Sequence, residues 1–329
     1  MSAKVETIIV DLSDDGLRLD RWFRVHFPEL AYGHLQKLLR SGQIRVDAKR
    51  ARSNTRLAQG QHIRVPKSVR QPSSDQVLAN SSQLTSTTDQ QLVEDWILFE
   101  DDAVLVLNKP YGIAVQGGTG TKRHIDGLLA GMVDRFGDRP RLVHRLDRDT
   151  TGVLLVAKTR GAATHLARTF QTRSVAKTYW ALTVGVPRPS QGKIEIALVK
   201  ASGPTGDRMR KAAPGEQARA MHAATHYAVI DAVARKAAWV SLKPVTGRQH
   251  QLRAHMSMIG HPIAGDNKYG GNLALAENAI SGKLHLHARR LIVPHPNNLG
   301  SLDVTAPLPV HMRESWSTLG LNPNRYDAD

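Results

Sequence analysis

The first 66 residues alternate between helical and strand-like spacing of apolar side chains. Apolar residues recur at intervals of one to four across residues 17–27, which predicts an amphipathic helix. Leucines across residues 35–39 predict a second helix, and Ser41-Gly42 predicts its end, because glycine readily adopts the left-handed conformation that follows a helix. Apolar and polar residues alternate at 43–46 and 62–65, which predicts two strands. This pattern indicates a small α+β domain.

The chain then changes character. The stretch from about residue 68 to residue 91 is rich in Ser, Thr, Gln and Asp and poor in large apolar groups, so it cannot bury enough surface to offset its ordering entropy. Beyond it, short β-rich runs at 103–107, 153–157 and 239–242 are separated by helical stretches. We predict an α+β protein of two domains. Its boundaries are 1–67 for the small domain, 68–92 for a flexible linker and 93–329 for the large domain.

Charge changes this picture, because it points to a partner. Forty-five Lys and Arg oppose 29 Asp and Glu, a net charge of +16. A surplus of this size suits a polyanion such as nucleic acid, since phosphate contacts release counterions; solubility is the alternative explanation. The chain has no cysteine, which excludes a disulfide framework, a thiolate nucleophile and Cys-ligated zinc. No apolar run is long enough for a membrane span and no secretory signal is present, so we expect a cytoplasmic protein.

Candidate chemistry concentrates in residues 142–152, Leu-Val-His-Arg-Leu-Asp-Arg-Asp-Thr-Thr-Gly. A mostly polar run that leads into a strand-like segment is typical of an active-site loop on a rigid scaffold. Asp147 lies between Arg145 and Arg148 in the sequence, and Asp149 directly follows Arg148. A neighbouring arginine favours the ionised carboxylate that a nucleophile or an electrostatic stabiliser requires. The same spacing fits a structural ion-pair turn equally well.

Metal and nucleotide sites have weaker support. His285/His287 and His250/His255 lack the i, i+4 spacing of a zincin. Residues 117–122, Gly-Gly-Thr-Gly-Thr-Lys, do not complete a phosphate-binding loop, and we expect a flexible segment there. We therefore expect no metal and no cofactor.

Residues 144–152, HRLDRDTTG, resemble the HRLDxxTSG signature of the RluA family of pseudouridine synthases, with Thr151 where serine is usual. Further blocks agree in content and order, and the resemblance spans residues 94–310. These blocks are Asn108-Lys109-Pro110-Tyr111-Gly112, residues 177–182 (KTYWAL), residues 246–255 (TGRQHQLRAH) and residues 260–270 (GHPIAGDNKYG). The resemblance implies a catalytic domain with a mixed, largely antiparallel central sheet and an active-site cleft.

The resemblance also implies roles for single residues. Asp147 matches the nucleophile, which attacks either ribose C1′ or uracil C6 during isomerisation of uridine. Tyr179 matches the tyrosine that packs on uracil and helps to remove the C5 proton, and Arg248 matches the arginine that pairs with the catalytic aspartate. Arg145 matches an arginine that replaces the flipped base in the RNA stack. The substrate-binding residues implied are Arg145, Leu252, His144 and Lys109.

We expect structural roles for three side chains. We expect His144 to order the loop and not to act as a base. Asp149 is expected to bond loop amides or Thr151, and Asp266 to be a turn residue that orders the pocket wall.

Residues 35–50, LQKLLRSGQIRVDAKR, resemble the S4 RNA-binding domain, which places a basic helix face against RNA phosphates. These charges could instead be a solvated face. The RNA contacts that the resemblance implies are Arg21, Lys37, Arg40, Arg45 and Lys49.

Residues 97–102, 105–110 and 114–120 resemble the RluC branch, which acts on large-subunit ribosomal RNA, although Gln116 stands where histidine is frequent in the wider family. We therefore expect a monomeric enzyme that isomerises uridines of 23S rRNA. Three alternative functions stay open. These are action on tRNA or other rRNA sites, a non-catalytic S4-type RNA-binding or ribosome-assembly protein, and an RNA N-glycosidase, which would need two carboxylates flanking the bond.

Overall fold

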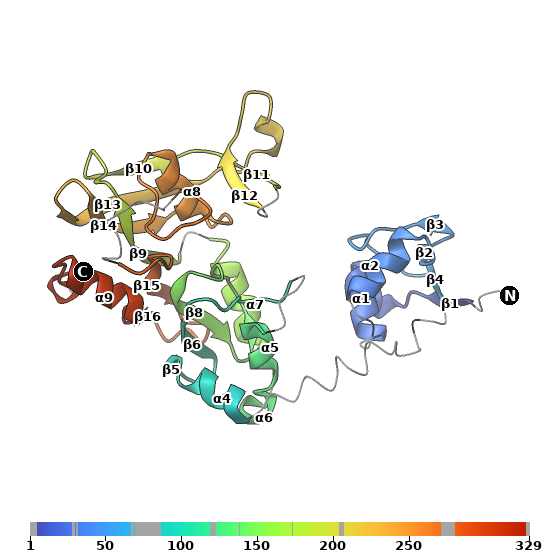
Figure 1. The fold of residues 1–329 in the computed structure, drawn as a ribbon. Helices are drawn as coiled ribbons and strands as arrows, with labels where there is room; N and C mark the ends of the chain where they lie inside the picture. Colours follow the sequence, from blue (N-terminus) through green and yellow to red (C-terminus); the bar gives the residue numbers. More distant parts are fainter. Residues whose placement is uncertain are drawn as a thin grey trace. The chain divides into compact units, whose positions relative to one another are not determined.

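A computed structural model of the chain describes residues 5–27, 30, 32–66, 69, 87–118, 123–137, 139–172, 174–203, 207–270 and 280–326. The chain divides into two compact units, Met1–Leu84 and Thr85–Asp329 (Figure 1).

The first unit joins two helices and a four-stranded antiparallel sheet in one core. Trp22, Phe23, Ile44 and Ile63 are at most 1% exposed and come from both layers. The helices at 19–26 and 32–40 and the strands at 45–46 and 62–66 confirm the elements expected from spacing, whereas β1 was not predicted. The elements are β1 (Val5–Ile9), α1 (Leu19–His26), α2 (Tyr32–Arg40), β2 (Arg45–Val46), β3 (Lys49–Arg50) and β4 (His62–Pro66), with strand order β1-β4-β2-β3.

The second unit is built on one large sheet, which has ten strands within the described residues. Its main path runs β10-β13-β14-β9-β15-β8-β6-β5, with β16 beside β15 and β7 beside β8. The strands are β5 (Ile97–Glu100), β6 (Val104–Lys109), β7 (Arg141–Leu142), β8 (Thr151–Ala157), β9 (Ala176–Val184), β10 (Gln191–Glu195), β13 (Ala224–Val233), β14 (Ala237–Pro244), β15 (Leu286–Pro294) and β16 (Ser301–Thr305). A separate hairpin pairs β11 (Leu198–Ala201) with β12 (Arg208–Lys211).

The sheet is antiparallel throughout its described pairings except where β15 runs parallel to β8. This parallel contact consists of two residue pairs, His287 with Thr151 and Ala288 with Gly152. The mixed, largely antiparallel sheet predicted for the catalytic domain is confirmed. The parallel contact matters because it lies at the end of the loop that carries Asp147.

Helices cover both faces of the sheet, which is why β8 is buried along its whole length. Leu128 of α5 packs on the β6–β8 face that carries Leu154, while Leu166 of α7 packs on the opposite face that carries Leu155. In the other half of the sheet, α8 and α9 pack in separate clusters on neighbouring strands. The helices are α4 (Thr87–Glu94), α5 (Ile125–Ala130), α6 (Val133–Phe136), α7 (Arg160–Thr169), α8 (Gln251–Met258) and α9 (Val310–Thr318).

Helix α4 changes one predicted boundary. Residues 87–92 were assigned to the linker, yet they are helical and belong to the second unit. Val93 is fully buried, and the Gln90 side chain donates a hydrogen bond of 2.9 Å to the carbonyl oxygen of Gly131. At the other end of the predicted linker, Val69 is buried in the core of the first unit. Residues 68 and 70–86 lie outside the described residues.

Candidate active site

The loop at residues 143–150 is held at its end by the parallel contact between β8 and β15. Gly152 has φ +104°, and a Cβ atom there would come within 2.2 Å of the carbonyl oxygen of Ala288. Glycine tolerates both this conformation and this close approach, whereas other residues do not. The Thr151 hydroxyl lies 2.8 Å from Nδ1 of buried His287. The Thr-Gly end of the motif therefore fixes where the loop leaves the sheet.

Lys109 supports the same loop from beneath. Its side chain is fully buried, and its ammonium group donates to the carbonyl oxygens of Pro110 (2.9 Å) and Arg148 (2.8 Å). Burial lowers the pKa of Lys109 to about 7, although the charges of Asp149 and Asp147 oppose this shift. The prediction that Lys109 binds substrate is wrong in this structure, because Lys109 lines neither cavity beside Asp147. It anchors the loop instead.

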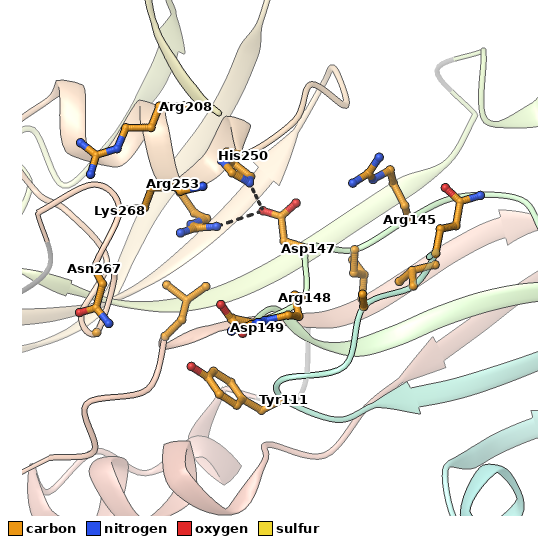
Figure 2. Close-up of a pocket in the computed structure, with 16 residues that line it drawn as sticks. Tyr111, Arg145, Asp147, Arg148, Asp149, Arg208, His250, Arg253, Asn267 and Lys268 are labelled. Carbon is orange, nitrogen blue, oxygen red and sulfur yellow. Dashed lines mark hydrogen bonds and ion pairs between the residues drawn. The ribbon is translucent and has the colours of Figure 1, made fainter. Parts of the chain in front are cut away.

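Asp147 projects from this loop toward the start of α8. Its Oδ2 atom lies 3.5 Å from Nη1 of Arg253 and 3.8 Å from Nε2 of His250 (Figure 2). The predicted pairing with Arg248 is wrong: Arg248 is exposed and its Nε donates to the carbonyl oxygen of His222 at 3.0 Å. The reason is local, since α8 begins at Gln251, so that Arg248 precedes the helix while Arg253 lies within it.

Arg253 is itself held by a second carboxylate. Its Nε and Nη2 atoms donate to the two oxygens of Asp266, at 2.7 and 2.8 Å. Burial alone would lower the pKa of Arg253, but the hydrogen bonds to Asp266 raise it above its usual value. Asp266 is 1% exposed and also accepts from the backbone N–H groups of Lys268 and Tyr269. The structural role predicted for Asp266 is confirmed, and its consequence is a rigid cation facing Asp147.

Two cavities meet at Asp147. The first, called here the Tyr179 cavity, has a volume of about 1010 Å³ and includes Tyr179, Leu252 and Arg248 in its wall. The second, called here the Arg208 cavity, has a volume of about 630 Å³ and is drawn in Figure 2. The residues common to both walls are Arg145, Leu146, Asp147, His250 and Arg253.

The structure brings six of the predicted residues to the Tyr179 cavity: His144, Arg145, Asp147, Tyr179, Arg248 and Leu252. Asp147 comes from the loop before β8, Tyr179 from β9 and Leu252 from α8. Burial and the neighbouring charge of Asp147 raise the pKa of Tyr179, so its hydroxyl stays protonated at neutral pH. A neutral phenol offers a ring face that can pack against a base. The role of Tyr179 in removing the C5 proton stays a prediction. An aromatic ring, an aliphatic side chain and a carboxylate in one cavity fit a flat, polar ring with reactive atoms at its edge.

The other predicted loop residues divide into exposed and structural ones. Arg145 is exposed and borders both cavities. His144 accepts the backbone N–H of Leu155 at Nε2 (2.8 Å) and stacks on Phe170, and burial lowers the pKa of His144 to about 3. Although His144 also borders the Tyr179 cavity, these contacts agree with the predicted loop-ordering role. Asp149 accepts from Nε of Arg148 at 3.1 Å, and Thr151 bonds His287 instead. Of the two partners expected for Asp149, loop amides or Thr151, Thr151 is therefore wrong.

In the first unit, the predicted RNA contacts differ in availability. Arg21, Lys37 and Lys49 are exposed. Arg45 uses its guanidinium within the unit, donating to the carbonyl oxygens of Gly42 and Ala48, and Nε of Arg40 donates to the carbonyl oxygen of Gln36. Their contacts with RNA stay predictions.

The histidines weighed as metal ligands have other partners. His285 bonds Ser315, His287 bonds Thr151, and His255 bonds Thr225. Over the described ranges, no three His, Asp or Glu side chains gather as a metal site.

Part of the Gly-rich segment at 117–122 lies outside the described residues. Within the part of the chain that is described, no helix has the length and apolar character needed to cross a membrane.

Comparison with known proteins shows which family the chain belongs to. The family described as RNA pseudouridylate synthase matches residues 103–258. The chain is 36% identical over 306 residues to ribosomal large subunit pseudouridine synthase C of Vibrio vulnificus (strain CMCP6), covering 91% of this chain and 92% of the relative. It is 33% identical to the mitochondrial RNA pseudouridine synthase 4 of Arabidopsis thaliana, covering 91% and 78%. The solved structure of human RNA pseudouridylate synthase domain containing 4 has 32% identity and a TM-score of 0.60, covering 71% of this chain and 98% of that chain. The chain is thus an RNA pseudouridine synthase and belongs to the RluC branch of the RluA family.

Proposed function

We propose that this enzyme converts specific uridines of large-subunit (23S) ribosomal RNA into pseudouridine, with Asp147 as its nucleophile. One observation carries the proposal: the Asp147 carboxylate shares a cavity with the Tyr179 ring and Leu252 and faces the Arg253 guanidinium at 3.5 Å. Relatives from Vibrio, Rickettsia and Yersinia are named as ribosomal large subunit enzymes, which supports the choice of RNA.

The reaction begins when the target uridine leaves the RNA stack, because its reacting atoms are inaccessible within it. Asp147 attacks either ribose C1′ or uracil C6, and the N-glycosidic bond breaks. The base turns, C5 bonds to C1′ and the bond to Asp147 breaks. The C5 proton passes to solvent water and N1 takes up a proton, so that substrate and product are isomers and the rearrangement is redox-neutral. Tyr179 and Leu252 hold the two faces of the base, while Arg253 complements the charge of Asp147. Arg145, exposed between both cavities, fills the gap in the stack.

A glycosidase that released uracil would need a second carboxylate flanking the sugar. Asp147 is the only acidic side chain among the described residues that line the Tyr179 cavity. Asp149 lines only the Arg208 cavity and pairs with Arg148. This arrangement supports isomerisation over hydrolysis.

The first unit is proposed to be an S4-type domain that contributes RNA affinity through Arg21, Lys37 and Lys49, whose side chains are exposed. We further propose that the enzyme acts as a monomer in the cytoplasm, where ribosomal RNA is folded and assembled.

The decisive variant is Asp147→Asn, which keeps the shape of the side chain and removes the nucleophile. It should bind RNA normally and release no tritium from uridine labelled at C5. Retained tritium release would refute the role of Asp147, and free uracil as product would refute isomerisation. Mapping pseudouridine in ribosomal RNA from cells with and without the gene tests the choice of substrate; unchanged 23S sites would refute it.

A further inference from the structure

The flipped uridine fills one of the two cavities at Asp147, which leaves the Arg208 cavity without an assigned ligand. Its volume of about 630 Å³ lies within the range of small-ligand sites. Figure 2 shows its walls: Arg208, Asn267 and Lys268 lie on the far side of Arg253 from Arg145, and Tyr111 and Asp149 lie below them. A ligand in this space would touch Asp147 and Arg253 on one side. On the other side it would touch the Arg208 wall, which consists of Arg208, Asn267 and Lys268.

The Arg208 wall is cationic and has capacity for an anion. Arg208 is exposed on β12, and within the described residues its guanidinium has no hydrogen-bond or ionic partner. By contrast, Arg210 on the same strand pairs with Glu216. The ammonium group of Lys268 donates to the carbonyl oxygen of Asp207 at 3.0 Å, which holds it beside β12 and leaves donors free. A guanidinium and an ammonium group in the wall of one cavity are typical of phosphate recognition.

We propose that the Arg208 cavity binds the nucleotide adjacent to the target uridine, with Arg208 and Lys268 contacting its phosphate. This inference rests on the proposed function, because the RNA strand must continue from the Tyr179 cavity and the two cavities share Asp147, Arg145 and Arg253. The subsite would explain how the enzyme grips the strand on one side of the flipped base.

The test measures RNA binding in an Asp147→Asn background, so that no chemistry is required. Arg208→Gln should weaken binding of a substrate oligonucleotide about 10-fold and reduce the slope of log affinity against log salt by about 0.7, the value for one single-strand phosphate contact. Lys211→Gln is the matched control, since Lys211 is an exposed cation of the same strand and does not line the cavity. Equal losses in the two variants would overturn the proposal.

A second arm locates the phosphate. Each phosphodiester near the target is replaced in turn by a neutral methylphosphonate. At one position next to the target, Arg208→Gln should cause no further loss of affinity, because the partner charge is already gone. Independent losses at every position would refute the subsite. Failure of the proposed function itself would appear elsewhere, as absent tritium release from the unmodified enzyme.

A separate observation concerns His250. The backbone N–H of Met209 donates to the Tyr269 hydroxyl oxygen at 2.7 Å, and that oxygen lies 3.0 Å from Nδ1 of His250. Nε2 of the same ring lies 3.8 Å from Asp147 (Figure 2). His250 has a left-handed backbone (φ 51°) immediately before α8.

Both ends of this chain of contacts select one tautomer. The Tyr269 oxygen already accepts from Met209, so its own O–H is available to donate to Nδ1 of His250. The carboxylate at the other end only accepts, so it favours a proton on Nε2. Burial and the charges of Arg253 and Lys268 disfavour imidazolium, although Asp147 favours it, and the pKa of His250 is lowered.

We infer that Tyr269 holds His250 in the Nε2–H tautomer and that His250 thereby positions the Asp147 carboxylate by donating to it. This inference rests on Asp147 being the nucleophile. An approach of about 0.6 Å brings the present separation of 3.8 Å into hydrogen-bond range. His250 and Arg253 would then orient the carboxylate from two directions.

Nitrogen NMR of the histidine-labelled protein without RNA tests the tautomer independently of activity. His250 should carry its proton on Nε2, and Tyr269→Phe should produce a mixture of tautomers. In single-turnover assays at saturating RNA, His250→Gln, which keeps an N–H near the Nε2 position, should retain most of the rate. Under the same conditions His250→Leu should lose about 10-fold in rate. His222→Leu, at an exposed histidine, is the control. A proton on Nδ1 in the parent protein, or an unchanged rate in His250→Leu, would refute the inference.

Discussion

The buried pair of Arg253 and Asp266 allows stability and chemistry to be separated. Arg253→Met removes a guanidinium whose side chain is 9% exposed and leaves the Asp266 carboxylate, with no exposed side-chain surface, without its cation. Breaking a buried pair in this way costs about 3–5 kcal/mol of unfolding free energy. Adding Asp266→Asn removes the stranded charge. The double variant should therefore recover most of that loss, because replacing both members of a buried pair is often nearly neutral.

Turnover should not recover with stability. The guanidinium that faces Asp147 is absent from both variants, so each should turn over about 100-fold more slowly or worse, the size expected for loss of one preorganised electrostatic contact. Arg248→Met provides the control for charge, because Arg248 is exposed and the described hydrogen bond of its side chain goes to the carbonyl oxygen of His222. Its unfolding free energy should change by less than about 0.5 kcal/mol.

Urea unfolding followed by tryptophan fluorescence suits the measurement, since four of the five tryptophans lie in the second unit: Trp96, Trp180, Trp239 and Trp316. Turnover is read as tritium release in a single-turnover assay. If Arg253→Met unfolds at the same urea concentration as the parent, the buried pair contributes nothing. If the double variant regains the parental rate, Arg253 acts only by neutralising Asp266 and the proposed contact with Asp147 is refuted.

Three further predictions follow from the supports of the site. Because burial lowers the pKa of Lys109 to about 7, the folded state binds fewer protons than the unfolded state between pH 7 and about 10.5. The Lys109 contribution to unfolding free energy should therefore rise by about 5 kcal/mol over this pH range. Lys109→Met should flatten the rise of the urea midpoint with pH, whereas Lys211→Met should not. Gly152→Ala should destabilise more than Gly112→Ala, because both glycines have positive φ but only Gly152 would drive its Cβ into Ala288; equal urea midpoints would contradict this. A chain starting at Thr85 should keep turnover on a short RNA while losing salt-sensitive affinity, whereas one starting at Asp95 lacks α4 and should be less stable, as calorimetry can check.

The elements that could be predicted are those with one buried face or a clear stop. Helix α2 ends at Arg40 before Gly42, as the Ser-Gly pair indicated, and β8 was visible as an apolar run. Helix α4 could not be distinguished from the polar linker, because its burial depends mainly on Val93 at its end. Its partner surface on α5 lies far away in sequence.

The sequence predicted which segments form the site, but not which side chains in those segments contact Asp147. Arg248 and Arg253 lie in the same block, and only the start of α8 decides which one reaches Asp147. Lys109 carried a usable signal: it follows Leu105 and Leu107 at a spacing of two in β6, which places it on the same inward face. A charged residue at an inward position indicates a buried support for the loop and not a surface contact.

The parallel junction between β8 and β15 has a mechanical consequence. It joins two antiparallel halves of the sheet through two residue pairs, and the groups around Asp147 come from both halves: Lys109 and Asp147 from one, Tyr179 and Arg253 from the other. A partial opening at this seam would pull the nucleophile from its cation while each half kept its own ladder of hydrogen bonds. Inactivation in mild denaturant should then precede the loss of circular dichroism, and amides at Thr151 and Gly152 should exchange earlier than those deep in β6.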